Sequence, residues 1–180
     1  MAPVSTNIQL GPVRLTYLYA FKTNQNGKYG ASILIPKSDK PVIERIKAAI
    51  DAAKKLGAAK WGDAFPAKPK VTLYDGDDYQ PEGKPWPAEC KGHYVLRASS
   101  SQQPGMVDRR CLTITDQTQL YSGVWANVDI NFYPYNNNSA GISCGLNNIQ
   151  KVRDDEPFGG RARAQDVFSA MEDEDDGLGL

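Results

Sequence analysis

The sequence is poor in the residues that most often carry catalysis or hold a metal ion. It has one histidine, His93, and three cysteines, Cys90, Cys111 and Cys144, among 180 residues. The cysteines are widely spaced and form no Cys-x-x-Cys pair, so neither a disulfide framework nor a zinc site is expected. One histidine also leaves little for a catalytic triad. We therefore expect no cofactor, no bound metal and no enzymatic activity.

Long apolar runs are absent as well. No stretch approaches the roughly 18 consecutive apolar residues that a membrane span requires, and residues 1–15 lack the basic and apolar regions of a signal peptide. The composition, 41% hydrophobic and 23% charged, is that of an ordinary globular domain. These features predict a cytoplasmic protein with no membrane partner.

Positive charge is missing from the end of the chain. All 21 basic residues precede residue 164, whereas six of the 21 acidic residues lie in 166–180. The body therefore carries a net charge of +6 and the last fifteen residues carry −6. An acidic end is often only a solubilising terminus. Beside a basic body it can also compete with a polyanion or recruit other proteins. The residues of this acidic tail are Glu172, Asp173, Glu174, Asp175 and Asp176.

The first third of the chain predicts a hairpin followed by a helix. Apolar and polar residues alternate over 11–22, Asn26-Gly27 is typical of a tight turn, and 29–36 form the returning strand. Over 38–60 the apolar residues recur at helical spacing, and Asp39 or the preceding serine provides an N-terminal cap.

The remainder predicts further strands separated by loops. A short strand lies within 68–75, a proline-rich loop spans 75–90, and longer strands follow at 92–100, 121–135 and 142–152. Gly145 is expected to form a bulge in the last strand. About six strands and one early helix favour an OB-like antiparallel barrel of five or six strands with the helix after the first hairpin. A β-sandwich is the second choice.

Aromatic and basic residues on the predicted strands indicate a surface for single-stranded nucleic acid. Bases stack on aromatic rings at roughly 1–3 kcal/mol each, and Lys and Arg neutralise phosphates. Each aromatic could instead pack under a loop or the helix. The candidate contact residues are Tyr17, Lys70, Tyr74, Trp86, Lys91, Arg97, Arg109, Trp125, Tyr133 and Tyr135.

Two other functions remain open from the residues alone. Asp75, Asp77 and Asp78 could hold a divalent metal in a nuclease, although aspartates around a glycine after a strand more often form a turn. A structural or adaptor protein that binds through an exposed sheet edge is the third possibility.

Five segments resemble successive parts of a family of phage single-stranded-DNA-binding proteins. The segments are GPVRLTYLYAF, KYGASILIPKSD, GHYVLRASS, YSGVWANVDINFYPYNN and GLNNIQKVRDDEPFGGRARAQDVF. The resemblance implies an OB-fold domain over 1–158 that coats single-stranded DNA during phage replication or recombination in the host cytoplasm. Residues 159–180 would then form a flexible linker and the acidic tail. It also implies replication or recombination proteins as possible tail partners, and a possible homo-oligomer.

The end of the chain departs from a common pattern of single-strand-binding proteins. Many of them finish an acidic tail with an aromatic residue that docks on partners, whereas this chain ends Gly-Leu-Gly-Leu. The nearest aromatic residue is Phe168, before the acidic run. Charge competition is therefore better supported than recruitment through the last residue.

Overall fold

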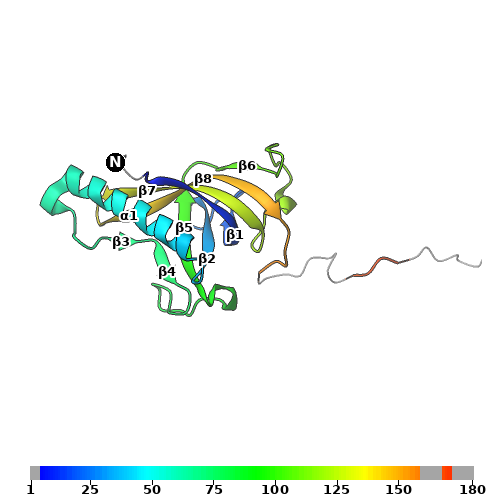
Figure 1. The fold of residues 1–180 in the computed structure, drawn as a ribbon. Helices are drawn as coiled ribbons and strands as arrows, with labels where there is room; N and C mark the ends of the chain where they lie inside the picture. Colours follow the sequence, from blue (N-terminus) through cyan, green and yellow to red (C-terminus); the bar gives the residue numbers. More distant parts are fainter. Residues whose placement is uncertain (1–4, 159–167, 172–180) are drawn as a thin grey trace, which may run out of the picture.

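A computed structural model describes residues 5–158 and 168–171 of the chain (Figure 1). The strands are β1 (Asn7–Tyr19), β2 (Tyr29–Pro36), β3 (Lys70–Val71), β4 (Leu73–Asp75), β5 (His93–Ser100), β6 (Gly105–Val107), β7 (Trp125–Asn136) and β8 (Ala140–Arg153). The long helix is α1 (Lys40–Trp61), and 3-10 turns occur at Gly62–Ala64, Ala88–Cys90 and Gln117–Gln119. The expected helix after the first hairpin is confirmed.

Five of the strands close into a barrel. β1 pairs with β2, β2 with β5, β8 with β7, and β7 with β1, all antiparallel. The ring is closed by a parallel contact between β5 and β8 at Ser99 and Gly145. The short strands lie at the margins, β3 and β6 against β8 and β4 against β5. The predicted OB-like barrel is thus confirmed over the sandwich.

The barrel interior follows the alternation of the sequence. On β7 every second residue from the second to the eighth points inward, and none of these is more than 1% exposed. These inward residues are Ala126, Val128, Ile130 and Phe132. The strand begins at Trp125, four residues later than predicted, because residues 121–124 form a turn instead of continuing the sheet. The apolar face of the predicted strand is therefore right and its start is wrong.

The pairing of β8 with β7 has two irregularities, and neither lies at the predicted position. Leu146 pairs with Ile130 and Asn148 with Asp129, so the extra residue is Asn147. Gly145 instead pairs in register with β7 and makes the contact with β5 that closes the barrel. The predicted bulge at Gly145 is wrong by two residues.

Helix α1 lies across the outside of the barrel and packs on β7 and β1 (Figure 1). Asp39 caps its start by accepting a hydrogen bond from the Val42 amide. Its apolar stripe is buried, and Gly57 allows the ring of Phe65 to approach: a Cβ there would lie 2.6 Å from that ring. Within 5–158 and 168–171, no helix is both long and apolar enough to cross a membrane.

Candidate nucleic-acid interface

A groove of about 560 Å³ opens on one side of the barrel. Its floor is formed by β1, β2 and β5, one wall by the loop that joins β1 to β2, and another by the loop before β5. The aromatic and charged side chains that line it are Tyr17, Tyr19, Lys28, Glu82 and Arg97. Two of these, Tyr17 and Arg97, are among the residues expected from the sequence.

Two tyrosines of β1 present their rings to this groove. Tyr17 is 42% exposed and Tyr19 is 40% exposed, so both rings are accessible to a ligand in the groove. Between Thr16 and Tyr19 the strand holds one residue more than its partner β2. The extra residue is accommodated by a bulge in which Tyr17 has a φ of 48°, in the left-handed region.

A non-glycine residue in the left-handed region costs on the order of 1–2 kcal/mol, and such strain is concentrated at functional sites. The bulge is fixed on its other side, where the Leu18 amide donates to Ser122 Oγ at 3.0 Å. Partial burial is the main cause that raises the pKa of the Tyr17 phenol further above physiological pH. A neutral, half-exposed ring held by a strained backbone suits stacking against a base.

Arg97 of β5 lies in the same groove between aromatic rings and polar groups. Its guanidinium carbon is 4.9 Å from the centroid of the Trp86 ring and 5.2 Å from that of Tyr74. Its terminal nitrogens donate to Glu82 Oε1 at 3.2 Å and to Gln80 Oε1 at 3.1 Å. Trp86 is only 5% exposed, so no base can stack on its ring in this arrangement.

The loop between β1 and β2 is a tight, internally bonded turn. Asn24 Oδ1 accepts from the amides of Asn26 and Lys28, at 2.9 and 3.1 Å. This order places the exposed Lys28 at the groove wall. The predicted turn at Asn26-Gly27 is confirmed, and Gly27 has the positive φ of 75° that such a turn requires.

Tyr133 lies beside the groove, whereas Tyr135 and Lys70 lie further along the barrel. Tyr133 is 40% exposed and pairs with Ser143, which lines the groove. Lys70 pairs with Gly141 at the end of β8 that also pairs with Tyr135. The structure therefore brings Tyr133 toward Tyr17 and Arg97 but not these other two residues.

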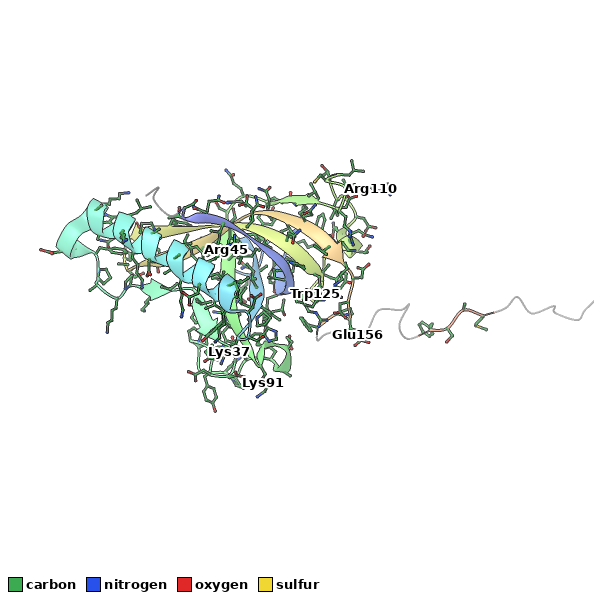
Figure 2. The ribbon with its side chains drawn as sticks, viewed as in Figure 1. Lys37, Arg45, Lys91, Arg110, Trp125 and Glu156 are labelled. Carbon is green, nitrogen blue, oxygen red and sulfur yellow. The ribbon has the colours of Figure 1, made fainter. Side chains whose placement is uncertain are left out.

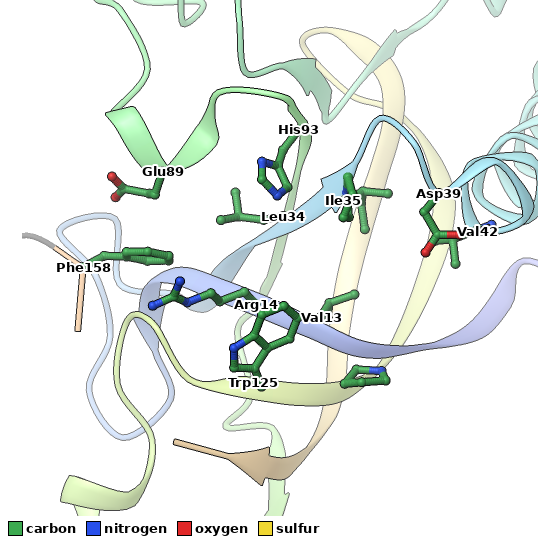
Figure 3. Close-up of a pocket in the computed structure, with 12 residues that line it drawn as sticks. Val13, Arg14, Leu34, Ile35, Asp39, Val42, Glu89, His93, Trp125 and Phe158 are labelled. Atoms are coloured by element: carbon green, nitrogen blue, oxygen red, sulfur yellow. Dashed lines mark hydrogen bonds between the residues drawn. The ribbon is translucent and has the colours of Figure 1, made fainter. Parts of the chain in front are cut away.

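Trp125 borders a different cavity, of about 200 Å³, near the start of α1 (Figure 3). Its indole N–H donates to Asp155 Oδ2 at 2.8 Å, and this bond is the main cause that lowers the pKa of Asp155. Arg14 lies 3.9 Å from the Phe158 ring centroid and donates to the Glu156 carbonyl. Trp125 thus holds the segment that follows β8.

The last two expected contacts do not line the groove. Lys91 is exposed in the turn before β5, and Arg109 lies in the loop after β6, where it donates to the Val152 carbonyl. Figure 2 shows Lys91 at the bottom of the molecule and Arg110, the neighbour of Arg109, at its upper right. Sequence reasoning missed Tyr19, Lys28 and Glu82. The alternation of β1 could have indicated Tyr19.

The three clustered aspartates form a turn. Lys37 Nζ lies 2.7 Å from both Asp75 Oδ1 and Asp77 Oδ2, and these hydrogen bonds are the main cause that lowers the pKa of each carboxyl. A Cβ on Gly76 would collide with the Cys90 carbonyl oxygen, so only glycine fits there. In the part of the chain that the structure describes, no three His, Cys, Asp or Glu side chains gather as metal ligands. The turn interpretation is favoured over the nuclease.

The acidic tail, Glu172 to Asp176, lies outside the described residues. Of the segment before it, residues 168–171 are described and exposed, with Phe168 at 75% and Met171 at 86%. The competition between this tail and DNA therefore stays a prediction.

Comparison with known proteins gives a family match over most of the chain. Residues 6–178 match the family model described as the single-stranded-DNA-binding protein of Enterobacter phage Enc34. Protein p50 of Acyrthosiphon pisum secondary endosymbiont phage 1 is 34% identical in an alignment that covers 93% of this chain and 97% of p50.

Two solved structures are similar in fold. The Enc34 single-stranded-DNA-binding protein in complex with single-stranded DNA has a TM-score of 0.72 and 26% identity, over 86% of this chain and 90% of that one. The single-stranded-DNA-binding protein gp2.5 of bacteriophage T7 has a TM-score of 0.61 and 15% identity, over 86% and 90%. The T7 likeness supports the barrel alone.

Proposed function

The chain belongs to the family of the Enc34 single-stranded-DNA-binding protein and binds single-stranded DNA, and we propose that the strand lies in the groove lined by Tyr17 and Arg97. The observation that carries this placement is the pair of half-exposed tyrosines on β1, one of them on a strained bulge. The solved complex of the similar Enc34 protein with single-stranded DNA supports binding by this barrel.

Binding in this groove would combine stacking with charge. Bases would stack on the rings of Tyr17, Tyr19 and Tyr133 at roughly 1–3 kcal/mol each, and Lys28 would neutralise a phosphate. Every base has a flat face, so stacking tolerates any sequence, as coating of DNA requires. Trp86, Lys70, Tyr135, Lys91, Arg109 and Trp125 are left out of this interface because of where they lie.

The biological role that follows is to coat and protect single-stranded DNA without chemistry, during phage replication or recombination in the host cytoplasm. The family match favours DNA binding over both the nuclease and the adaptor interpretation. The ion pairs that hold Asp75 and Asp77 on Lys37 support a protein that binds and does not cleave.

The domain boundary and the tail belong to the same proposal. We place the DNA-binding domain at 1–158, followed by a linker and acidic tail at 159–180. The opposite charges of the two parts, +6 and −6 over 1–165 and 166–180, support a tail that competes with DNA for the barrel and that other proteins could bind once it is released.

The decisive experiment is a titration of the full chain with an oligothymidylate, followed by tryptophan fluorescence and gel shift across a salt series. Saturable binding should weaken with salt at a slope near −0.7 per neutralised phosphate. The groove is tested with Tyr19→Ala, and Tyr79→Ala is the matched control because Tyr79 is 68% exposed and does not line the groove. Equal losses in the two variants would reject the groove, and absence of any binding at low salt would reject the function.

A further inference from the structure

We propose that Arg97 forms a subsite for a nucleobase, in which its guanidinium is the flat surface that a base covers. This inference rests on the proposed groove and changes the role of its central cation. An arginine in a DNA-binding groove is by default assigned to a phosphate. The charge of Arg97, however, is already paired with Glu82, and part of its side chain is open to the groove.

One face of the guanidinium is covered by aromatic rings. Trp86 and Tyr74 form a tilted pair with ring centroids 5.9 Å apart, and Arg97 lies over both of them. Trp86 belongs to a small buried cluster with Leu34, Cys90 and Val95. The guanidinium therefore lies against two rings that are themselves packed in the protein.

The terminal nitrogens of the same group are held by a rigid turn. Glu82 and Gln80 accept from the two terminal nitrogens of Arg97, as described above. Their loop is closed by hydrogen bonds from the Gln80 amide to the Lys84 carbonyl and from the Gly83 amide to the Gln80 carbonyl. Each terminal nitrogen keeps a second N–H, but a phosphate that approached it would face the Glu82 carboxylate, which carries charge of the same sign.

The remaining surface of Arg97 opens on the groove. The side chain is 34% exposed, and both Arg97 and Tyr17 line the cavity. Guanidinium planes stack on bases as they do on aromatic rings, which a lysine ammonium cannot do. A base in the groove would thus continue the stack of Trp86 and Arg97.

A base contact and a phosphate contact at Arg97 predict opposite orders of affinity for two variants. Arg97→Lys keeps the charge and removes the plane, whereas Arg97→Gln keeps a planar amide and removes the charge. Affinities are measured by anisotropy with a labelled oligothymidylate and with a strand of the same length built from abasic sites. On oligothymidylate, Arg97→Lys should bind about ten-fold more weakly than the unsubstituted protein. On the abasic strand the two should bind within about two-fold, since no base is lost.

The salt series gives a second, independent measurement. Lys28→Gln is the matched control, and it should reduce the salt slope by about 0.7, as loss of one phosphate contact does. Arg97→Gln should change the slope by clearly less and should bind oligothymidylate at least as well as Arg97→Lys. If Arg97→Lys binds oligothymidylate like the unsubstituted protein, or if Arg97→Gln lowers the slope as much as Lys28→Gln, Arg97 contacts a phosphate and the subsite is wrong.

The same Arg97 variants also separate an effect on folding from an effect on DNA binding. Unchanged melting temperatures of both Arg97 variants would exclude loss of the Trp86 cluster as the cause of weaker binding. If one variant is unstable, the ratio of its affinities for the two strands still decides, because a partly unfolded population lowers both affinities equally. Failure of the unsubstituted protein to bind oligothymidylate would reject the proposed function and with it the subsite. Normal binding with no loss in Arg97→Lys would reject the subsite alone.

Discussion

Two regions of the barrel combine an arginine, aromatic rings and acidic residues, yet they use these groups differently. In the groove, Arg97 lies over Trp86 and is bonded to Glu82, while the nearby tyrosines stay about 40% exposed. At the other cavity, Arg14 lies over Phe158 and reaches Asp155, and the returning chain covers Trp125. The same residue types therefore form the proposed binding surface in one place and an internal anchor in the other.

The difference between the regions lies in what the rings are left to contact. At the anchor, the indole N–H of Trp125 is satisfied by Asp155 and its ring is paired with Arg153 at 4.4 Å. In the groove, a strained backbone at Tyr17 keeps a ring facing solvent. An aromatic ring that stays exposed although its backbone is strained indicates function more strongly than the mere presence of aromatic residues does.

The largest expected effect is on stability, at the anchor. Trp125→Ala should lower the free energy of unfolding by about 3 kcal/mol, since a large, mostly packed ring and its hydrogen bond are lost. Urea denaturation measures this change, and Trp125→Phe should cost less because it keeps part of the packing. The affinity of the folded Trp125→Ala variant for oligothymidylate should stay within about two-fold of normal. Weaker binding at unchanged stability would move Trp125 into the interface and break the comparison.

In the groove, loss of a ring should mainly weaken DNA binding, in contrast to the loss of stability at the anchor. Tyr17→Ala should weaken binding to oligothymidylate by about 2 kcal/mol, the loss of one stacked base. Its salt slope should not change, because no phosphate contact is removed. Fluorescence titration at several salt concentrations checks both statements. The opposite result would be a much smaller salt slope with little loss of affinity at low salt. It would show that Tyr17 positions the basic side chains of the groove and does not stack on a base.

These contrasts also show how much of the site the sequence could predict. Alternation on β1 and β7, with the apolar run of β2 between turn signals, was enough for the barrel and its core, because such strand patterns are local properties of the sequence. The strands β3, β4 and β6, two or three residues long, are too short to show a period. Their existence depends on pairing with β5 and β8, which are distant in sequence.

The site was harder to predict because its residues meet only in the folded chain. Trp125 lies on the polar face that the sequence indicated, but the segment after β8 covers it, which no local pattern reveals. Trp86 lies in a loop that is polar and rich in proline, yet Arg97 and the packing of Leu34 bury it. The left-handed φ of Tyr17 is equally invisible, since nothing in the sequence separates it from Tyr19.

A smaller effect is expected from the chain that continues beyond the anchor. Removal of residues 166–180 takes away a charge of −6 and should tighten binding at low salt by about five- to ten-fold. The gain in affinity should vanish at high salt, because salt screens the charges of the tail from those of the barrel. Anisotropy titrations of the full and the truncated chain at several salt concentrations measure both effects.

The matched control for the tail keeps the full length of the chain. It replaces Glu172 and Glu174 by Gln and Asp176 by Asn, which removes three of the six negative charges in 166–180. Because half of the charge is lost, this variant should bind more tightly than the full chain but less tightly than the truncated chain. Equal affinities for the full chain and the truncated chain at low salt would count against competition by the tail.

The smallest expected effect isolates the backbone strain in the groove, with Tyr19 as its internal control. Both tyrosines lie on β1 and are about 40% exposed, but only Tyr17 has a left-handed φ. Tyr17→Gly and Tyr17→Ala remove the same ring, so the difference between them reports the backbone alone. Tyr17→Gly should be the more stable of the two by about 1 kcal/mol, because glycine adopts a positive φ without a steric penalty.

At Tyr19 the order should reverse. There φ is not in the left-handed region, so Tyr19→Gly should be less stable than Tyr19→Ala by about 0.5–1 kcal/mol, the usual entropic cost of glycine in a strand. Chemical denaturation of the four variants measures both differences. The same order at both positions would mean that the bulge imposes no strain at Tyr17, and exposure alone would then distinguish the groove from the anchor. Opposite orders would show that the fold gives up stability at Tyr17 but not at Tyr19, although both rings are proposed to meet bases.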